Sequence, residues 1–279
     1  VILLFSVDFT KKSFNIYTIS AALLYFISAL ISYLVLIKLK KDVKANNDIS
    51  SSTRKLGFLL IAFLVSANIF VASSGFHLIT KKKKLEYILI FEAFLVNIAI
   101  IFVSSINLFK EVLPDNFYFG IIILILVSLF FILSMYLISI KEIKQNKKLF
   151  YFISAICILT ILIGNIFSFL AGITMILKII HKDDDISIEF VDILYRVFRN
   201  EMAVIGMFFV IFLFALSIMS TFTFNYADAI ENNYTALLQT PSLIYPFGTD
   251  NYGRDVFSRI VFGARISLII GVISTLIPI

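Results

Sequence analysis

Acidic and basic side chains recur at regular spacing near the C-terminal end of the sequence, between residues 248 and 259. Asp250 stands four residues before Arg254, and Asp255 stands four residues before Arg259. On a helix, an acid and a base at this spacing lie side by side and attract each other, and the acid-first order is the more favourable one. The spacing therefore predicts two ion pairs on one short helix.

Apolar residues of the same segment indicate where that helix lies. They would form one apolar face, made of Val256, Phe257, Ile260 and Val261. The arginines between them can extend toward lipid headgroups. Thr249 or Asp250 can cap a helix that begins near residue 251, and Gly263 can turn the chain into the next membrane span. We predict a short interfacial helix near residues 251–263.

Side chains that enzymes and metal sites need are scarce in this sequence. It has two histidines, His77 and His181, and one cysteine, Cys157, which lies within an apolar run. They form no Ser/His/Asp or Cys/His arrangement and no cluster with metal-ligand spacing. The sequence also lacks a Gly-x-x-x-x-Gly-Lys-Ser/Thr phosphate loop. We predict a protein that is not an enzyme, with no catalytic, cofactor-binding or metal-binding residue and no cofactor.

One carboxylate, Glu92, lies inside an apolar run. A charged group within a membrane span is expensive to bury and is a functional candidate by default. Glu92 lies only about five residues from the end of its run, however, so it can also reach Lys82 or Lys83 at the membrane interface. We favour the second interpretation.

The composition excludes an ordinary soluble domain. Hydrophobic residues make up 60% of the 279 residues, charged residues make up 15%, and the mean hydropathy is +1.01. A soluble domain carries about 25% charged residues, so the solvent for so much apolar surface must be lipid. The net charge of +6 does not indicate nucleic-acid binding, because the lysines stand at the ends of apolar runs.

Apolar runs of about 20 residues each are long enough to cross a bilayer. They predict an all-α, polytopic transmembrane helix bundle with about six full spans and a truncated final one. The predicted spans are Ser13–Ile37, Leu56–Thr80, Leu85–Phe109, Phe117–Ile140, Leu149–Ile180, Met202–Phe224 and the short Ile266–Ile279. A mixed-charge stretch before Met202 has helical apolar spacing and predicts an amphipathic helix on the membrane surface.

The fifth run, Leu149–Ile180, is longer than one span needs. It is either one long tilted helix or a pair of half-length segments hinged at Gly164-Asn165. The choice reverses the sidedness of everything upstream, and the counts of Lys and Arg in the loops do not settle it.

The last run, Ile266–Ile279, makes about 21 Å of helix, which is shorter than the roughly 30 Å hydrocarbon core. A helix that ended there would leave carbonyl groups unsatisfied in lipid. We therefore expect the sequence to be a fragment that continues beyond residue 279. We also expect it to start upstream of Val1.

The segment around the two predicted ion pairs resembles a known family. Its fixed positions are Gly248, Thr249, Asp250, Gly253, Arg254, Asp255, Ser258, Arg259, Gly263 and Arg265, followed by Ser267 and Leu268. This signature is similar to the segment after the first helix of the dipeptide/oligopeptide/nickel ABC-importer permeases, the OppC/DppC-like subunit. The resemblance extends upstream through Pro241-Ser242 and Phe198–Gly206. It departs at Asn225-Tyr226-Ala227-Asp228, where the family has a Pro-Tyr-Asp-Pro-like stretch.

The resemblance implies a bacterial, multi-pass protein of the plasma (inner) membrane that transports peptides or a related small solute such as a nickel chelate. Expected partners are a second permease subunit, ABC ATPase subunits that hydrolyse ATP, and an external or periplasmic solute-binding protein, with no nucleic acid. The family's Glu-Ala-Ala loop, which couples to the ATPase, does not occur within the sequence.

The resemblance also divides the chain. Residues 182–279 are expected to start a permease domain, with a first helix at 202–224, an external loop at 225–265 and an incomplete second helix at 266–279. Residues 1–181 are then a multi-spanning extension without a counterpart in the usual six-helix subunit. Because of this extension, we keep an alternative function, a membrane scaffold or sensor with a vestigial permease segment.

Overall fold

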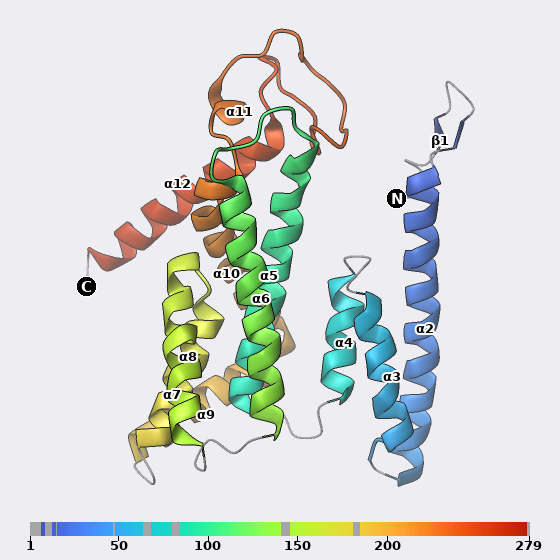
Figure 1. Ribbon diagram of the computed structural model, residues 1–279, viewed down its shortest axis with the longest axis vertical. Helices are drawn as coiled ribbons and strands as arrows, with labels where there is room; N and C mark the ends of the chain where they lie inside the picture. The colour runs from blue at the N-terminus through green and yellow to red at the C-terminus, as the bar shows by residue number, and fades with distance from the viewer. Residues whose placement is uncertain are drawn as a thin grey trace. The chain divides into compact units, whose positions relative to one another are not determined.

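A computed structural model shows a chain that is almost entirely helical (Figure 1). The chain divides into two compact units, residues 1–83 and residues 84–279, and each is described by itself. The structure describes residues 7–8, 13–14, 16–46, 48–63, 68–79, 84–140, 146–180 and 185–277.

The first unit contains one long helix and two short ones. A two-residue antiparallel pairing of β1 (Val7–Asp8) with β2 (Ser13–Phe14) precedes α2 (Ile16–Asn46). Helices α3 (Ser51–Ile61) and α4 (Ile69–Ile79) follow. Because α2 is apolar throughout its first three-quarters, it is long and apolar enough to cross a membrane, as predicted for the first span.

The predicted second span, Leu56–Thr80, is wrong as a single helix. The structure has α3 and α4 there, each about 16 Å long, which is roughly half of a bilayer core. The two helices pack through Gly57 and Gly75, where a Cβ on Gly57 would lie only 2.6 Å from the Gly75 carbonyl oxygen. Small residues at a helix contact allow such a close approach, and an apolar run alone does not reveal it.

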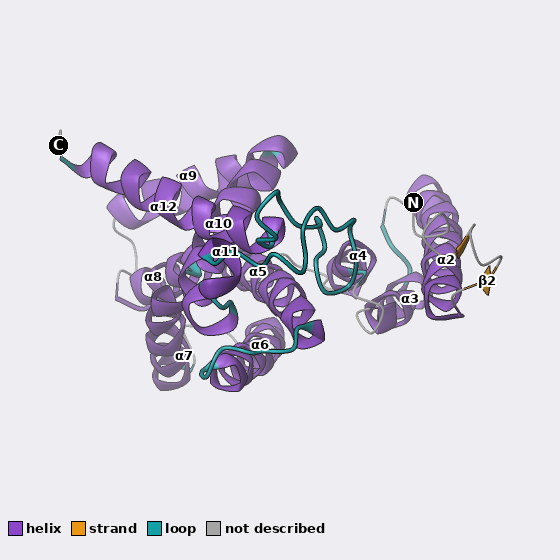
Figure 2. Cartoon of the chain, turned by 90° about the horizontal axis from the view of Figure 1, so that it is seen from above, coloured by secondary structure: helices purple, strands orange, loops and turns teal. Residues whose placement is uncertain are grey.

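The second unit is built around α5. Its core side chains include Leu89, Ile90 and Phe91 of α5, all at most 1% exposed. Helices α6, α8 and α10 lie around α5 (Figure 2). The elements of this unit are α5 (Leu85–Ser105), η2 (Ile106–Phe109), α6 (Phe117–Ile140), α7 (Lys147–Leu159), η3 (Thr160–Ile163), α8 (Ile166–Ile180), α9 (Asp185–Arg199), α10 (Glu201–Thr223), α11 (Ala227–Ile230) and α12 (Val256–Leu276).

Four helices among the described residues are long and apolar enough to cross a membrane. They are Ala22–Ala45, Leu85–Phe109, Phe117–Ile140 and Met202–Thr223. The predicted all-α membrane bundle is thus confirmed as a class, whereas the predicted count of six full spans and a truncated seventh is not confirmed.

The fifth apolar run folds back on itself. Helix α7 continues into η3, Gly164 takes a left-handed conformation with φ of 85°, and α8 returns antiparallel to α7. Glycine ends helices in this way because it has no Cβ to clash in the left-handed region. The structure therefore has the hinged pair at Gly164-Asn165 and not the single tilted helix.

Three asparagines that lie within the apolar runs join helices through side-chain hydrogen bonds. The Asn165 amide donates to the Ala93 carbonyl oxygen of α5 at 2.9 Å. Asn97 donates to Ser128 of α6 at 2.7 Å, and in the first unit Asn68 donates to Ser28 at 2.8 Å. Hydrogen bonds of this kind hold helices together in a solvent that offers no competing partners.

Both ends of the α7–α8 hairpin lie at the same end of the second unit (Figure 1). Helix α9 begins at this end too (Figure 1), and Phe198 in its last turn contacts Phe167 in the first turn of α8, near the tip of the hairpin. Basic side chains gather at this end, namely Lys84, Lys147, Lys148, Lys178 and Arg196. The α5–α6 connection and the long loop between α10 and α12 lie at the opposite end.

Candidate functional site: the signature loop and its cavity

Two glycines shape the loop between α10 and α12. Gly248 and Gly253 have φ of 74° and 75°, a region that side-chain-bearing residues rarely adopt. A Cβ on Gly253 would overlap the carbonyl oxygen of Asn233, and one on Gly248 would overlap that of Gln239. These signature glycines are therefore required both by the backbone conformation and by the neighbouring chain.

Thr249 holds two stretches of the loop together from a buried position. Its hydroxyl donates to the Ala236 carbonyl oxygen at 2.5 Å and accepts the N–H of Gln239 at 2.8 Å. The side chain thus satisfies two backbone groups from a stretch that has no regular secondary structure, which is the condition for burying such groups.

Replacing Thr249 with valine is expected to open this loop. Valine keeps the shape but leaves the Ala236 and Gln239 backbone groups without their partner, at a cost of about 1–3 kcal/mol. Limited trypsin digestion at Arg254 in detergent should become faster, because cleavage follows local opening. Thr249→Ser keeps the hydroxyl and should be cleaved at the wild-type rate. Equal rates for the valine and serine variants would contradict this role.

Asp250 forms ion pairs with two arginines at the surface of the loop. Its carboxylate lies 2.8 Å from the Arg254 guanidinium and 2.5 Å from that of Arg259. Desolvation raises the pKa of Asp250, but hydrogen bonds from Arg254 and from the Tyr252 N–H, with the Arg254 charge, outweigh it and lower that pKa to about 2. The Arg254 guanidinium also lies 4.6 Å from the centre of the Tyr252 ring. The predicted pair of Asp250 and Arg254 is confirmed.

The helix that follows begins later than predicted and does not stop where predicted. Its N-cap is Asp255, whose carboxylate accepts the Phe257 N–H at 3.0 Å, and α12 runs unbroken through Gly263 to Leu276. The predicted interfacial helix near 251–263 is therefore wrong. Gly253, in its left-handed turn, prevents a helix from starting earlier. Gly263 costs a helix only about 1 kcal/mol, which is too little to end it.

The predicted pair of Asp255 with Arg259 is also wrong. As the N-cap, Asp255 turns toward the inside of the unit and is 1% exposed. Arg259 points outward, with its side chain 45% exposed, and pairs with Asp250 instead. Arg265 lies farther along α12, half-buried, and makes no ion pair with any described residue.

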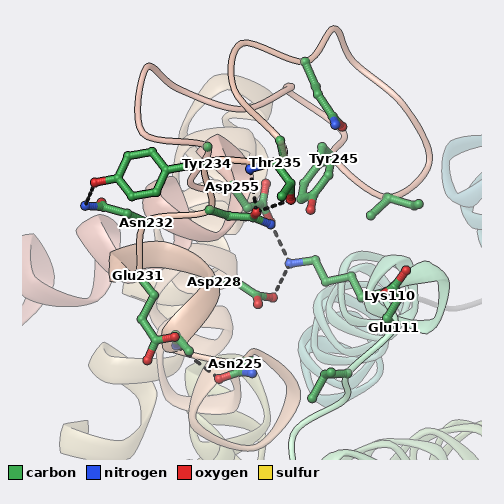
Figure 3. A pocket seen from close by; sticks show the side chains of 17 residues that line it. Lys110, Glu111, Asn225, Asp228, Glu231, Asn232, Tyr234, Thr235, Tyr245 and Asp255 are labelled. Carbon is green, nitrogen blue, oxygen red and sulfur yellow. Dashed lines mark hydrogen bonds and ion pairs between the residues drawn. The ribbon is translucent and has the colours of Figure 1, made fainter.

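The partner of Asp255 comes from the connection between α5 and α6. Lys110, just after η2, places its Nζ 2.6 Å from Asp255 and 2.7 Å from Asp228 of α11 (Figure 3). It also donates to the Ser258 hydroxyl at 3.0 Å, and Ser258 donates to Asp255 at 2.6 Å. We call these four residues the Lys110 cluster.

Lys110 was missed by reasoning from the sequence. It stands 145 residues before Asp255, at the end of an apolar run, where a lysine ordinarily reaches toward headgroups and water. No spacing rule links residues so far apart. The only signal was an acidic residue in the signature that needs a cation once it is buried.

A cavity of about 860 Å³ lies beside the Lys110 cluster (Figure 3). One wall comes from the α5–α6 connection and the other from the loop after α10. The side chains that line it include acids, amides and tyrosines, among them Glu111, Asp228, Glu231, Asn225, Asn232, Tyr234 and Tyr245. Within the described residues no group of His, Cys, Asp and Glu is arranged to hold a metal ion. The cavity offers hydrogen bonds and negative charge.

Glu92 lies apart from this cavity, within α5, and is 9% exposed. Its predicted contact with Lys82 or Lys83 falls outside the described residues. The nearest described acid on α5, Glu86, is fully buried and forms an ion pair with Lys178 of α8.

Comparison with known proteins finds a family match for the segment that runs from α9 into the first half of the loop. Residues 190–241 match the family described as the N-terminal TM domain of oligopeptide transport permease C. This match confirms the resemblance to a dipeptide or oligopeptide ABC permease component. Together with the four apolar helices, it makes the chain a multi-pass protein of the inner membrane.

Individual relatives are named as permease proteins of transport systems. The dipeptide transport system permease protein DppC of Bacillus subtilis is 39% identical over 82 residues, which are 29% of this chain and 25% of the relative. DppC of Haemophilus influenzae is 38% identical over 85 residues, covering 28% of each chain. The glutathione transport system permease protein GsiD of Pectobacterium atrosepticum is 37% identical over 82 residues, 29% of this chain and 27% of the relative.

The chain thus spans about a quarter of the length of these curated relatives. No solved structure matches it.

Proposed function

We propose that the chain is a transmembrane permease subunit of an ABC importer for peptides or a related small solute such as a nickel chelate. The observation that carries the proposal is the permease match at residues 190–241, immediately followed by the signature string. In this proposal residues 182–279 start the permease domain and residues 1–181 are an extension. The chain forms part of the path, and its partner subunits hydrolyse ATP.

The charge distribution supports one orientation in the membrane. The end that carries Lys84, Lys147 and Lys148 is the basic one, and basic residues favour the cytoplasmic side. The opposite end carries the signature loop and the acidic lining of the cavity. The loop and its cavity then face outward, toward a solute-binding protein, and α9 lies at the cytoplasmic surface. Because the α7–α8 hairpin does not cross, the basic start of α7 and the mixed-charge helix α9 both fall on that cytoplasmic side.

Co-purification in mild detergent tests the proposal. The full chain, carrying an affinity tag and expressed in its own host, should bring along a second permease subunit and ABC ATPase subunits. A chain in which residues 185–277 are replaced by unrelated helices is the control and should lose them. Recovery of the intact chain without any ATPase would overturn the proposal and favour the scaffold or sensor alternative.

A further inference from the structure

The Lys110 cluster joins the helix and loop that follow α10 to a residue far upstream of them in the sequence. Asp228, Asp255 and Ser258 belong to the loop and helix after α10, which carry the permease signature. Lys110 lies far upstream of residues 190–241, the segment that matches the permease family. The signature of the permease segment is thus completed by a side chain from the extension.

Asp255 has no other source of positive charge within the described residues. Its carboxylate is 1% exposed, and its described polar partners are Lys110, the Ser258 hydroxyl and the Phe257 N–H. The two nearby arginines, Arg254 of the loop and Arg259 of α12, both pair with Asp250. A buried carboxylate that loses its cation remains desolvated and uncompensated, which is strongly unfavourable.

The α5–α6 connection, which carries Lys110, forms one side of the cavity. Lys110, Glu111 and Val112 line it from the α5–α6 connection, and the loop after α10 lines it from the other side. Lys110 also contacts α11 through Asp228 and the start of α12 through Asp255, so one ammonium group fixes both ends of the opposing wall (Figure 3). The shape of the cavity therefore depends on the extension.

We infer that Lys110 is a positioning residue that holds the signature loop and the start of α12 in place, and that the extension thereby forms a permanent wall of the cavity. This inference rests on the proposed function only where it calls the cavity the outer mouth of an importer. The contacts themselves are independent of transport. The α5–α6 connection of the extension is then a structural part of the mouth.

Labelling of a buried cysteine tests the inference on the full purified chain in detergent. Ala229, in α11 next to Asp228, is 5% exposed and becomes the reporter as Ala229→Cys in a Cys157→Ala background. Lys110→Met should speed its reaction with a maleimide by about tenfold or more, because labelling of a buried site follows local opening. Lys110→Arg keeps the charge and should restore slow labelling.

Two further variants distinguish the positioning role of Lys110 from a general loss of stability. Lys148→Met removes an exposed lysine at the opposite end of the unit and should leave the labelling rate unchanged. Asp228→Asn leaves the pair of Lys110 with Asp255 intact and should label more slowly than Lys110→Met. If Ala229→Cys reacts fast even with Lys110 intact, Ala236→Cys, at 4% exposure, takes its place as reporter.

Equal labelling rates for Lys110→Met and the unmodified background would overturn the inference, as would failure of Lys110→Arg to restore protection. The test needs no partner subunit. Faster labelling of Lys110→Met together with failed co-purification of an ATPase would refute the proposed function and leave the role of Lys110 standing.

Discussion

Replacing Asp255 with alanine is expected to destabilise the unit formed by residues 84–279 more than the loss of any other charged side chain in the signature. The change removes the N-cap of α12, which is worth about 0.5–2 kcal/mol. It also takes the main partner from Lys110, whose side chain is 7% exposed. Breaking a buried pair costs about 3–5 kcal/mol, but Asp228 continues to neutralise the lysine. We therefore expect a total of about 2–4 kcal/mol.

Thermal unfolding in detergent measures this effect, and Asp228→Asn is the matched control. Asp228 contacts the same ammonium group, but it is 27% exposed and caps no helix, so its loss should lower the melting temperature much less. Asp255→Asn should fall between the two, because an amide can still cap a helix but carries no charge. Equal melting temperatures for Asp255→Ala and the wild type would contradict the account of the Lys110 cluster.

A second large effect is expected at the tip of the α7–α8 hairpin. Gly164 has φ of 85°, and a Cβ there would lie 2.7 Å from the Ala215 Cα of α10. Gly164→Ala therefore meets backbone strain of about 1–3 kcal/mol and a neighbour that cannot rotate away. The variant should push the hairpin away from α10 and break the contact of Asn165 with Ala93.

The native cysteine reports on that displacement. Cys157 is fully buried in α7, so it should react slowly in the wild type and at least about tenfold faster in Gly164→Ala, because its labelling follows local opening. Gly206→Ala is the control, since no atom lies within 4 Å of a Cβ at Gly206 of α10. That change should leave labelling unchanged and can strengthen the helix by up to about 1 kcal/mol. Slow labelling of Cys157 in Gly164→Ala would show that the tip tolerates a side chain.

The sequence predicted the long helices well because a membrane imposes their length. Helices α5, α6 and α10 lie where their apolar runs place them, and α9 follows the amphipathic spacing before Met202. The same reasoning failed for α3 and α4, because an apolar run of this length is equally compatible with one span or with two half-length helices. The packing of α3 against α4, for example at Gly57 and Gly75, distinguishes these, and it is a tertiary contact.

The sequence named several residues of the loop but not the contacts that hold most of them in place. The string between Gly248 and Arg259 identified the loop, and Asp250 pairs with Arg254 as the spacing predicts. The partner of Asp255 could not be predicted, because Lys110 is joined to it only by the packing of α5 against α10. Spacing rules describe neighbours on one helix. The buried carboxylate of Asp255 instead pairs with a lysine that lies far away in the sequence.

The hairpin and the outward-facing signature loop both depend on which ends of the second unit lie on which side of the membrane. If α7 and α8 form a hairpin that enters and leaves at one surface, Lys148 and Asp192 lie on the same side of the membrane and Leu243 lies on the other. All three side chains are exposed. Each can therefore be replaced singly by cysteine in a Cys157→Ala background.

Labelling of these variants in intact spheroplasts with a membrane-impermeant maleimide is the most direct test. Leu243→Cys should react from outside, while Lys148→Cys and Asp192→Cys should react only after the membrane is permeabilised. Denaturation in detergent, which exposes every cysteine, provides the reference. Labelling of Lys148→Cys and Asp192→Cys from opposite sides would contradict the hairpin, and protection of Leu243→Cys in intact cells would contradict an outward-facing permease loop.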